Sequence, residues 1–197
     1  MRIAIFGGTF DPIHTAHLVV AREAAQMFSL DRVLFIPAAN PPHKEAGASY
    51  EHRYRMVELA CAGEPRFVPS RLEESRPGGP AKSYSIDTIE RVKAEGGEVF
   101  FVIGADAFAE IRTWHRWEDV VRAVDFIVVT RPGHTYTIPP GARVHRLDTI
   151  ELAGSSTEIR QLLASGKAAR ELPKPVVDYI RANALYLNRA TAVRPER

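Results

Sequence analysis

Two histidines, His14 and His17, lie three residues apart shortly after a glycine pair, Gly7 and Gly8. A short apolar run, residues 3–6, precedes the glycines, and an alanine-rich pattern with helical spacing follows the histidines. This order predicts a strand, a tight turn and the N-terminus of a helix that carries both imidazoles. Glycine backbone and the free N–H groups of a helix N-terminus can approach phosphate oxygens closely. The stretch therefore predicts a site for an anion.

The same two histidines also fit the start of a metal site, because residues at i and i+3 share one face of a helix. No third histidine or carboxylate follows nearby at helical spacing, and Asp11 belongs to the turn. We therefore favour an anion site over structural zinc. Two familiar phosphate-binding patterns are absent from the sequence. It contains no G-x-x-x-x-G-K-[ST], and the dinucleotide fingerprint fails because Thr9 and Phe10 follow the glycine pair.

Strand and helix patterns alternate over the first 130 residues or so. Continuous apolar runs predict strands at residues 2–6, 32–36, 67–68, 99–103, 126–129 and 144–147. Apolar residues at three- and four-residue spacing predict helices at residues 18–28, 50–62, 85–95 (capped by Ser85 or Asp87), 117–123, 155–165 and 175–182. Short apolar strands of this kind belong to parallel sheets covered on both faces. We predict an α/β fold with a doubly wound, mostly parallel sheet and a small helical C-terminal part.

The composition is that of an ordinary globular chain. Of the 197 residues, 45% are hydrophobic and 25% are charged, which allows a sizeable core. We predict a single domain over residues 1–189, mainly helical from about residue 150, and a flexible tail over residues 190–197. The single cysteine, Cys61, lies in an apolar helical pattern. We expect it to be a core thiol, and a lone cysteine excludes an intramolecular disulfide.

The charge balance gives a weaker indication of partners. A net charge of +2 and a pI near 8.8 do not favour a nucleic-acid-binding protein, but they are compatible with anionic ligands. No apolar run approaches the 18 residues of a membrane span, and the N-terminal run of four is too short for a secretion signal. We therefore expect a cytoplasmic protein with no membrane partner.

Small or charged residues follow most of the expected strands, at the edge where an open α/β sheet binds its ligands. They are Gly8, Thr9, Phe10, His14 and His17 after the first strand, residues 40–44 with Lys44 after the second, Gly104 and Asp106 after the fourth, Arg131 after the fifth, and Ser155, Ser156, Thr157 and Arg160 at a later helix start. Glycines allow close approach, the basic residues supply donors and positive charge, and a carboxylate can accept from ribose hydroxyls. Such a set predicts a polyanion site. A plain turn at Arg131, and a plain helix cap formed by residues 155–157 with Glu158, remain as alternatives.

Two of these segments carry a family resemblance. Residues 7–17 (GGTFDPIHTAH) are similar to the signature of the HxGH nucleotidylyltransferases, and residues 154–160 (GSSTEIR) resemble their second signature, I-S-S-T-x-I-R. Shorter blocks resemble one branch of them, the bacterial nicotinate-nucleotide adenylyltransferases. These blocks are residues 41–44 (PPHK), 83–88 (SYSIDT), 103–106 (IGAD) and 113–117 (TWHRW). The resemblance extends from residue 3 to about residue 182, with the motifs in the same order.

The resemblance implies a Rossmann-like fold and a reaction of NAD biosynthesis. ATP and nicotinate mononucleotide would give deamido-NAD (nicotinate adenine dinucleotide) and pyrophosphate. The phosphate of the mononucleotide would attack the α-phosphorus of ATP in line, without a covalent enzyme intermediate. Mg²⁺ would accompany the reaction, carried by the ATP phosphates rather than by protein ligands. This chemistry agrees with the residues, because an anionic nucleophile needs positioning and charge neutralisation rather than a base.

The resemblance also implies a role for each residue. His14, His17 and Arg160 would be catalytic, with both histidines on the ATP phosphates and His17 stabilising charge on the transferring group. The ATP site would further comprise Gly8, Thr9 and Phe10 by their backbone, Ser156 and Thr157 at the β- and γ-phosphates, Gly104 and Asp106 at the ribose, and Arg131. The pyridine nucleotide would meet Lys44, Ser85, Trp114 and His115, with Trp114 stacked on the ring. From the residues alone, Trp114 also fits a core aromatic.

Three positions depart from the family pattern. Ala16 replaces the usual glycine between the histidines and adds a methyl group close to the expected ATP site. Gly154 replaces the usual isoleucine before the two serines, and we expect it to loosen a packing position. His115 replaces the tyrosine that often follows the stacking tryptophan. A site for the nicotinate carboxylate needs N–H or cationic donors, and Arg76, Lys82 and His115 are the candidates.

Two alternative functions remain. One is pantetheine-phosphate adenylyltransferase, a related enzyme whose chains are usually shorter; the blocks at residues 83–88 and 114–117 argue against it. The other is a nucleotide-binding sensor that has lost catalysis. The presence of all the charged groups argues against a sensor.

Overall fold

The computed structural model describes residues 1–39, 46–74, 84–130, 135–148 and 154–187. Within them, six strands form one sheet: β1 (Arg2–Gly8), β2 (Arg32–Pro37), β3 (Phe67–Pro69), β4 (Glu98–Gly104), β5 (Asp125–Thr130) and β6 (Arg143–Asp148). Every neighbouring pair is parallel, in the order β3-β2-β1-β4-β5-β6. This is the doubly wound order, whose switch point lies between β1 and β4. The predicted fold class is confirmed.

The helices also follow the sequence pattern closely. They are α1 (Thr15–Met27), α2 (Tyr50–Cys61), α3 (Ser85–Ala94), α4 (Ala105–Ala109), α5 (Trp117–Ala123), α6 (Ser156–Ala164) and α7 (Lys174–Ala182), with a 3₁₀ turn, η1, at Ile111–Thr113. The sequence did not predict α4 and η1, because five and three residues are too few to show an apolar period. The predicted caps of α3 are wrong: Tyr84 is the N-cap and uses no side-chain hydrogen bond.

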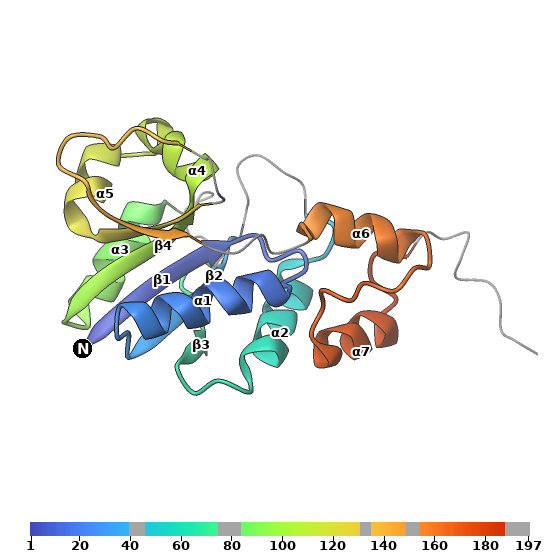
Figure 1. The fold of residues 1–197 in the computed structure, drawn as a ribbon. Helices are drawn as coiled ribbons and strands as arrows, with labels where there is room; N and C mark the ends of the chain where they lie inside the picture. The colour runs from blue at the N-terminus through green and yellow to red at the C-terminus, as the bar shows by residue number, and fades with distance from the viewer. Residues whose placement is uncertain (40–45, 75–83, 131–134, 149–153, 188–197) are drawn as a thin grey trace, which may run out of the picture.

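Two hydrophobic layers cover the two faces of the sheet. Alternate residues of each strand point to opposite faces, so Phe6 and Phe35 join the layer under α1 and α2. Ile5 and Phe101 join the opposite layer, which contains residues of α3, α4 and α5 (Figure 1). The strands are therefore apolar on both faces, which explains their continuous apolar runs.

The last two helices stand beside the sheet rather than on it. Figure 1 shows α6 and α7 next to α2 and to the end of α1 where that helix begins. Ile159, Val176 and Ile180 bury their side chains in the same layer as α1 and α2. The small helical C-terminal part therefore extends the hydrophobic layer formed by α1 and α2. The predicted tail, residues 190–197, lies outside the described residues.

Cys61 is a buried free thiol in the same hydrophobic layer, as predicted. Burial raises its pKa to about 12, so the reactive thiolate form is strongly disfavoured. None of the helices that the structure describes combines the length and hydrophobicity needed to cross a membrane.

Candidate active site

In the turn after β1, the side chain of Phe10 is buried and packs into the core. Phe10 is only 2% exposed, and its ring packs edge-on against Phe6 and His17, at centroid distances of 5.8 and 5.1 Å. A Cβ added at Gly8 would lie 3.1 Å from the Phe10 ring, so a side chain at this position would press on the buried ring and glycine is favoured. The main chain of Gly8, Thr9 and Phe10, rather than the Phe10 side chain, is what this segment offers to a ligand.

His14 and His17 occupy the N-terminal end of α1. The helix begins at Thr15, three residues earlier than expected, so His14 is the N-cap and His17 is the third helical residue. The backbone N–H of His14 donates to Nδ1 of His17 across 3.2 Å, and the two ring centroids are 3.9 Å apart. Because Nδ1 of His17 accepts a hydrogen bond, the neutral ring carries its proton on Nε2. His17 thus holds an N–H donor at a helix N-terminus.

Both imidazoles are neutral in the free protein. Burial lowers the pKa of His14 to about 4, although the negative charge of Glu171 acts in the opposite direction. Burial also lowers the pKa of His17 well below its usual value, and the neighbouring His14 lowers it further. Nδ1 of His14 is buried and has no hydrogen-bond partner among the described residues. An unpaired buried nitrogen is costly, and a bound ligand is one way to satisfy it.

The N-terminus of α6 reaches the same turn from the other side. The Ser156 hydroxyl donates to the backbone oxygen of Pro12 across 3.0 Å. Nη1 of Arg160 donates to the backbone oxygen of Asp11 at 2.6 Å, and Nη2 of Arg160 lies 3.3 Å from the hydroxyl of Thr157. The two segments that carry the family resemblance are therefore in direct contact, although Pro12 and Ser156 lie 144 residues apart in the chain.

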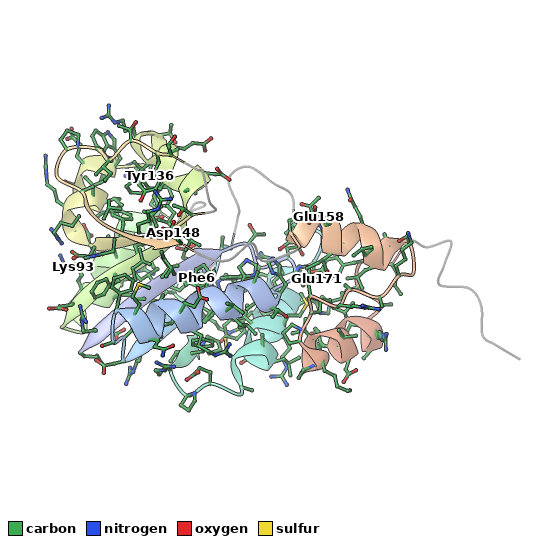
Figure 2. The ribbon with its side chains drawn as sticks, in the orientation of Figure 1. Phe6, Lys93, Tyr136, Asp148, Glu158 and Glu171 are labelled. Atoms are coloured by element: carbon green, nitrogen blue, oxygen red, sulfur yellow. The ribbon has the colours of Figure 1, made fainter. Side chains whose placement is uncertain are left out.

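The cap expected at the start of α6 is also present. Ser155 accepts from the backbone N–H of Glu158 at 3.2 Å, and Glu158 accepts from the backbone N–H of Ser155 at 2.7 Å (Glu158 is labelled in Figure 2). This capping box fixes the first turn of the helix. The next residue, Ser156, contacts the turn after β1 through Pro12, and Thr157 is exposed beside Arg160.

We expect from the sequence that Gly154 loosens the packing before α6, but the structure shows close packing at this residue. Its φ is +96°, a conformation that favours glycine, and a Cβ here would lie 2.9 Å from Cγ of Glu171. The backbone oxygen of Glu171 (the residue is labelled in Figure 2) accepts from both the backbone N–H and the hydroxyl of Thr15 at 2.7 Å. Gly154 thus lets residue 171 approach closely enough to bind the first residue of α1.

A second group of candidates lies at the end of β4, across the switch point. The register pairs Phe6 of β1 with Val102 of β4, so both strands end at the same edge of the sheet. Gly104 is the exposed N-cap of α4, and Asp106, in the first turn, is exposed too. The structure therefore brings Gly104 and Asp106 to the edge that also holds Gly8.

An aromatic group lies beyond α4. Trp114 follows η1, is partly buried, and packs edge-on against Phe101 at 5.8 Å. The exposed ring of His115 lies 4.2 Å from the Tyr84 ring, with 32° between the two planes. Because Tyr84 caps α3, this contact brings His115 to the helix end that carries Ser85. The three predicted pyridine-site residues Ser85, Trp114 and His115 thus gather in one region.

Some predicted residues cannot be placed. Lys44 and Arg131 lie outside the described residues, as do Arg76 and Lys82, two of the candidates for the nicotinate carboxylate. The part of the chain that the structure describes contains no group of three or more histidine, cysteine, aspartate or glutamate side chains able to hold a metal ion.

Sequence reasoning missed three polar residues packed around this turn: Asp11 and Arg53, which are buried, and Tyr186, which is partly buried. Asp11, which is 3% exposed, accepts a 2.7 Å hydrogen bond from the hydroxyl of Tyr186. Arg53, which is 1% exposed, donates to the backbone oxygens of Thr9 and Ala48 at 2.7 and 3.3 Å. The only signal in the sequence was the position of Asp11 between the glycines and the histidines. Its partners lie too far along the chain for spacing to reveal them.

The switch-point fold and the paired helix N-termini define a class of nucleotide-binding transferase, and comparison with known proteins agrees. A model of the cytidylyltransferase-like family matches residues 5–162. A protein of Solibacter usitatus named probable nicotinate-nucleotide adenylyltransferase is 59% identical over 192 residues, covering 94% of this chain and all of that protein. A Thermus thermophilus protein of the same name is 43% identical over 189 residues, with the same coverage.

Solved structures show the same fold. A Plasmodium falciparum nicotinic acid mononucleotide adenylyltransferase, complexed with NaAD, has a TM-score of 0.74 at 21% identity, covering 94% of this chain and 97% of that one. The chain therefore belongs to the cytidylyltransferase-like family and, within it, to the nicotinate-nucleotide adenylyltransferases. The resemblance inferred from residues 7–17 and 154–160 is confirmed.

Proposed function

We propose that this enzyme transfers the adenylyl group of ATP to nicotinate mononucleotide, giving deamido-NAD and pyrophosphate. The names of the relatives support this reaction. The observation that carries it is the contact between Ser156 and Pro12. That contact puts the N-termini of α1 and α6 on one turn at the carboxyl end of β1. The first turns of two helices and one arginine then converge where a triphosphate can bind.

In this reaction no protein side chain needs to form a covalent bond to the substrates. A phosphate oxygen of nicotinate mononucleotide forms a bond to the α-phosphorus of ATP, while the bond from that phosphorus to the bridging oxygen of the β-phosphate breaks. Pyrophosphate carries away the electron pair of the broken bond. The nucleophile is already an anion, so no general base is needed, and the barrier is the approach of two polyanions. We propose direct in-line attack without a covalent enzyme intermediate.

His17 meets this need as a neutral donor. Its Nε2–H is fixed because Nδ1 accepts from the backbone of His14, and a donor held in place before the reaction stabilises charge as it develops. We propose that His14 and His17 bind the phosphates around the transferred phosphorus, with the backbone of Gly8, Thr9 and Phe10. Ser156, Thr157 and Arg160 would bind the β- and γ-phosphates, which leave as pyrophosphate, on the side facing away from the two histidines.

The two nucleosides would occupy the far side of the switch point. We propose that Gly104 and Asp106 face the adenosine ribose, and that the indole of Trp114 stacks on the pyridine ring. Ser85 and His115 would lie at the edge of that ring, close to the nicotinate carboxylate. Lys44 and Arg131 would add positive charge near the phosphates.

A divalent cation fits this site as a companion of ATP. The described residues offer no cluster of ligands for it, and Mg²⁺ often binds through substrate phosphates and water. We propose that Mg²⁺ enters with the triphosphate and neutralises part of its charge. The chain's own residues then bind and orient the phosphates.

Pyrophosphate release tests the proposal. ATP with nicotinate mononucleotide should release pyrophosphate, and ATP with phosphopantetheine should not. Release with phosphopantetheine alone would transfer the assignment to the pantetheine-phosphate branch of the family, and no release with either acceptor would favour a nucleotide-binding sensor.

A further inference from the structure

Asp11 is a buried carboxylate that joins three distant segments of the chain. It lies in the turn between β1 and α1 and is 3% exposed. Its Oδ2 accepts from the backbone N–H of Gly47 at 2.6 Å, and its Oδ1 accepts from the backbone N–H of Ala48 at 3.1 Å. Residues 47 and 48 lie between β2 and α2, so this carboxylate fixes the main chain that leads into α2.

The C-terminal segment supplies the third hydrogen bond. Tyr186, four residues after α7, donates its hydroxyl to Oδ1 of Asp11 at 2.7 Å. Burial, together with the hydrogen bond to Asp11, raises the pKa of Tyr186 far above its usual range. The hydroxyl therefore keeps its proton and remains a donor.

Arg160 depends on the same carboxylate. Its Nη1 lies 3.5 Å from Oδ2 of Asp11 and donates to the backbone oxygen of Asp11 at 2.6 Å. The packing is close: a Cβ at Gly47 would lie 3.3 Å from both Cδ of Arg160 and Cε1 of Tyr186. A shift of Tyr186 or of the Asp11 carboxylate would therefore be transmitted to the arginine.

We propose that Tyr186 and Asp11 are positioning residues for adenylyl transfer. The hydroxyl of Tyr186 fixes the Asp11 carboxylate, and the carboxylate holds Arg160 and the main chain of residues 47–48 in the geometry that the reaction needs. The C-terminal segment thereby completes a site built at the other end of the chain. This inference rests on the proposed function, because it assigns Arg160 to the ATP phosphates.

We expect loss of the Tyr186 hydroxyl to lower the rate of adenylyl transfer more than the stability of the fold. Loss of the hydroxyl leaves Asp11 with its two backbone donors and with Arg160 nearby, so the turn keeps most of its hydrogen bonds. Oδ1 of Asp11, however, then keeps only the longer 3.1 Å bond from the Ala48 N–H, so the carboxylate is held less firmly. Small displacements of a positioned cation reduce transition-state stabilisation strongly.

Tyr186→Phe tests the proposal, and Tyr179→Phe is its matched control. The hydroxyl of Tyr179 also makes one partly buried hydrogen bond, with Nδ1 of His52 at 2.9 Å. Among the residues that the structure describes, it makes no hydrogen bond to the turn after β1. We expect Tyr186→Phe to lower kcat roughly tenfold, the loss expected for one hydrogen bond to a charged group. The KM for nicotinate mononucleotide should stay unchanged. Tyr179→Phe should leave kcat unchanged when both variants are assayed well below their melting temperatures.

Two further readouts separate positioning from general stability. In hydrogen exchange, the amides of Gly47 and Ala48 should exchange faster in Tyr186→Phe than in Tyr179→Phe. In a double-mutant cycle, Tyr186→Phe should cost little when added to Asp11→Asn, because the two residues act through one contact. Asp11→Asn keeps the size of the side chain, and it should lower kcat at least as much as Tyr186→Phe does.

The outcomes distinguish this inference from the proposed function. A wild-type enzyme that is active on nicotinate mononucleotide, with equal kcat in both tyrosine variants, would overturn the positioning role alone. Fully additive effects of Asp11→Asn and Tyr186→Phe would also overturn it. An inactive wild type would reject the proposed function and with it the role in adenylyl transfer, whereas the exchange rates of Gly47 and Ala48 would still report whether Tyr186 holds this turn.

Discussion

The backbone N–H of His14 donates to Nδ1 of His17 across 3.2 Å at the first turn of α1. This bond decides which nitrogen of His17 faces a ligand as a donor. In the proposed function, His17, whose pKa is lowered by burial, would serve the phosphates through this oriented N–H group rather than through a permanent positive charge.

The first prediction concerns that donor. His17→Ala should lower kcat by roughly 10²–10³, the usual cost of one donor that stabilises transition-state charge. His17→Gln, which keeps an N–H donor on its side chain, should recover part of the loss. Circular dichroism should show an unchanged fold in both variants. An alanine variant with wild-type turnover would remove His17 from the mechanism.

The pKa of His14 predicts how stability depends on pH. Its pKa is lowered to about 4 in the folded state, against about 6.5 in an unfolded chain. Between these values the unfolded chain binds the proton and the folded protein does not. The free energy of unfolding should therefore fall as the pH drops from about 6.5 towards 4, and His14 should contribute nothing to the pH dependence above about pH 7.

Urea unfolding between pH 4.5 and pH 7 measures this effect. His14→Asn should reduce the slope of unfolding free energy against pH by about 1.4 kcal/mol per pH unit around pH 5, the contribution of one proton. An identical slope in the wild type and the variant would show that His14 is not a buried neutral group.

Trp114 supplies the third prediction. Trp114→Ala should raise the KM for nicotinate mononucleotide more than the KM for ATP, because its indole is proposed to stack on the pyridine ring. Trp114 also packs against Phe101, so Trp114→Phe serves as the variant that keeps an aromatic ring. It should restore most of the binding. Equal effects of Trp114→Ala on the two KM values would instead favour a purely structural tryptophan.

The fourth prediction concerns the glycine before α6. Gly154 and Gly166 both have positive φ, +96° and +72°, but only at Gly154 would a Cβ meet another group, Cγ of Glu171 at 2.9 Å. Gly166→Ala should therefore cost roughly 1 kcal/mol of stability from the backbone alone. Gly154→Ala should cost roughly 1–3 kcal/mol more, because it also overpacks the contact with Glu171. Equal midpoints of urea unfolding for the two variants would contradict the close approach.

Most of the fold could be read from the sequence because its signals are local. The strands are buried on both faces, so each appears as a continuous apolar run, and the amphipathic helices repeat at helical spacing. The pattern fails where the signal is short or ambiguous. α4 and η1 are too brief to show a period, and the polar side chains of Ser85 and Asp87 favour a cap at either residue, whereas the N-cap is Tyr84.

The candidate site also contains residues that a local sequence pattern reveals and residues that it does not. His14 and His17 could be found because they follow a strand end and a glycine pair, which is a local pattern. Asp11 and Tyr186 could not be paired, since they lie 175 residues apart and meet only through the packing of the C-terminal part. Polar residues that orient other residues leave no spacing pattern in the sequence, because their partners are set by tertiary structure.

The central claim is that the adenylyl group passes from ATP to nicotinate mononucleotide. Product analysis with ATP labelled at the α-phosphate tests it most directly. We predict that the label appears in deamido-NAD, with one pyrophosphate released for each dinucleotide formed. Label that remains in ATP, or that appears in AMP without a dinucleotide, would contradict the proposed reaction.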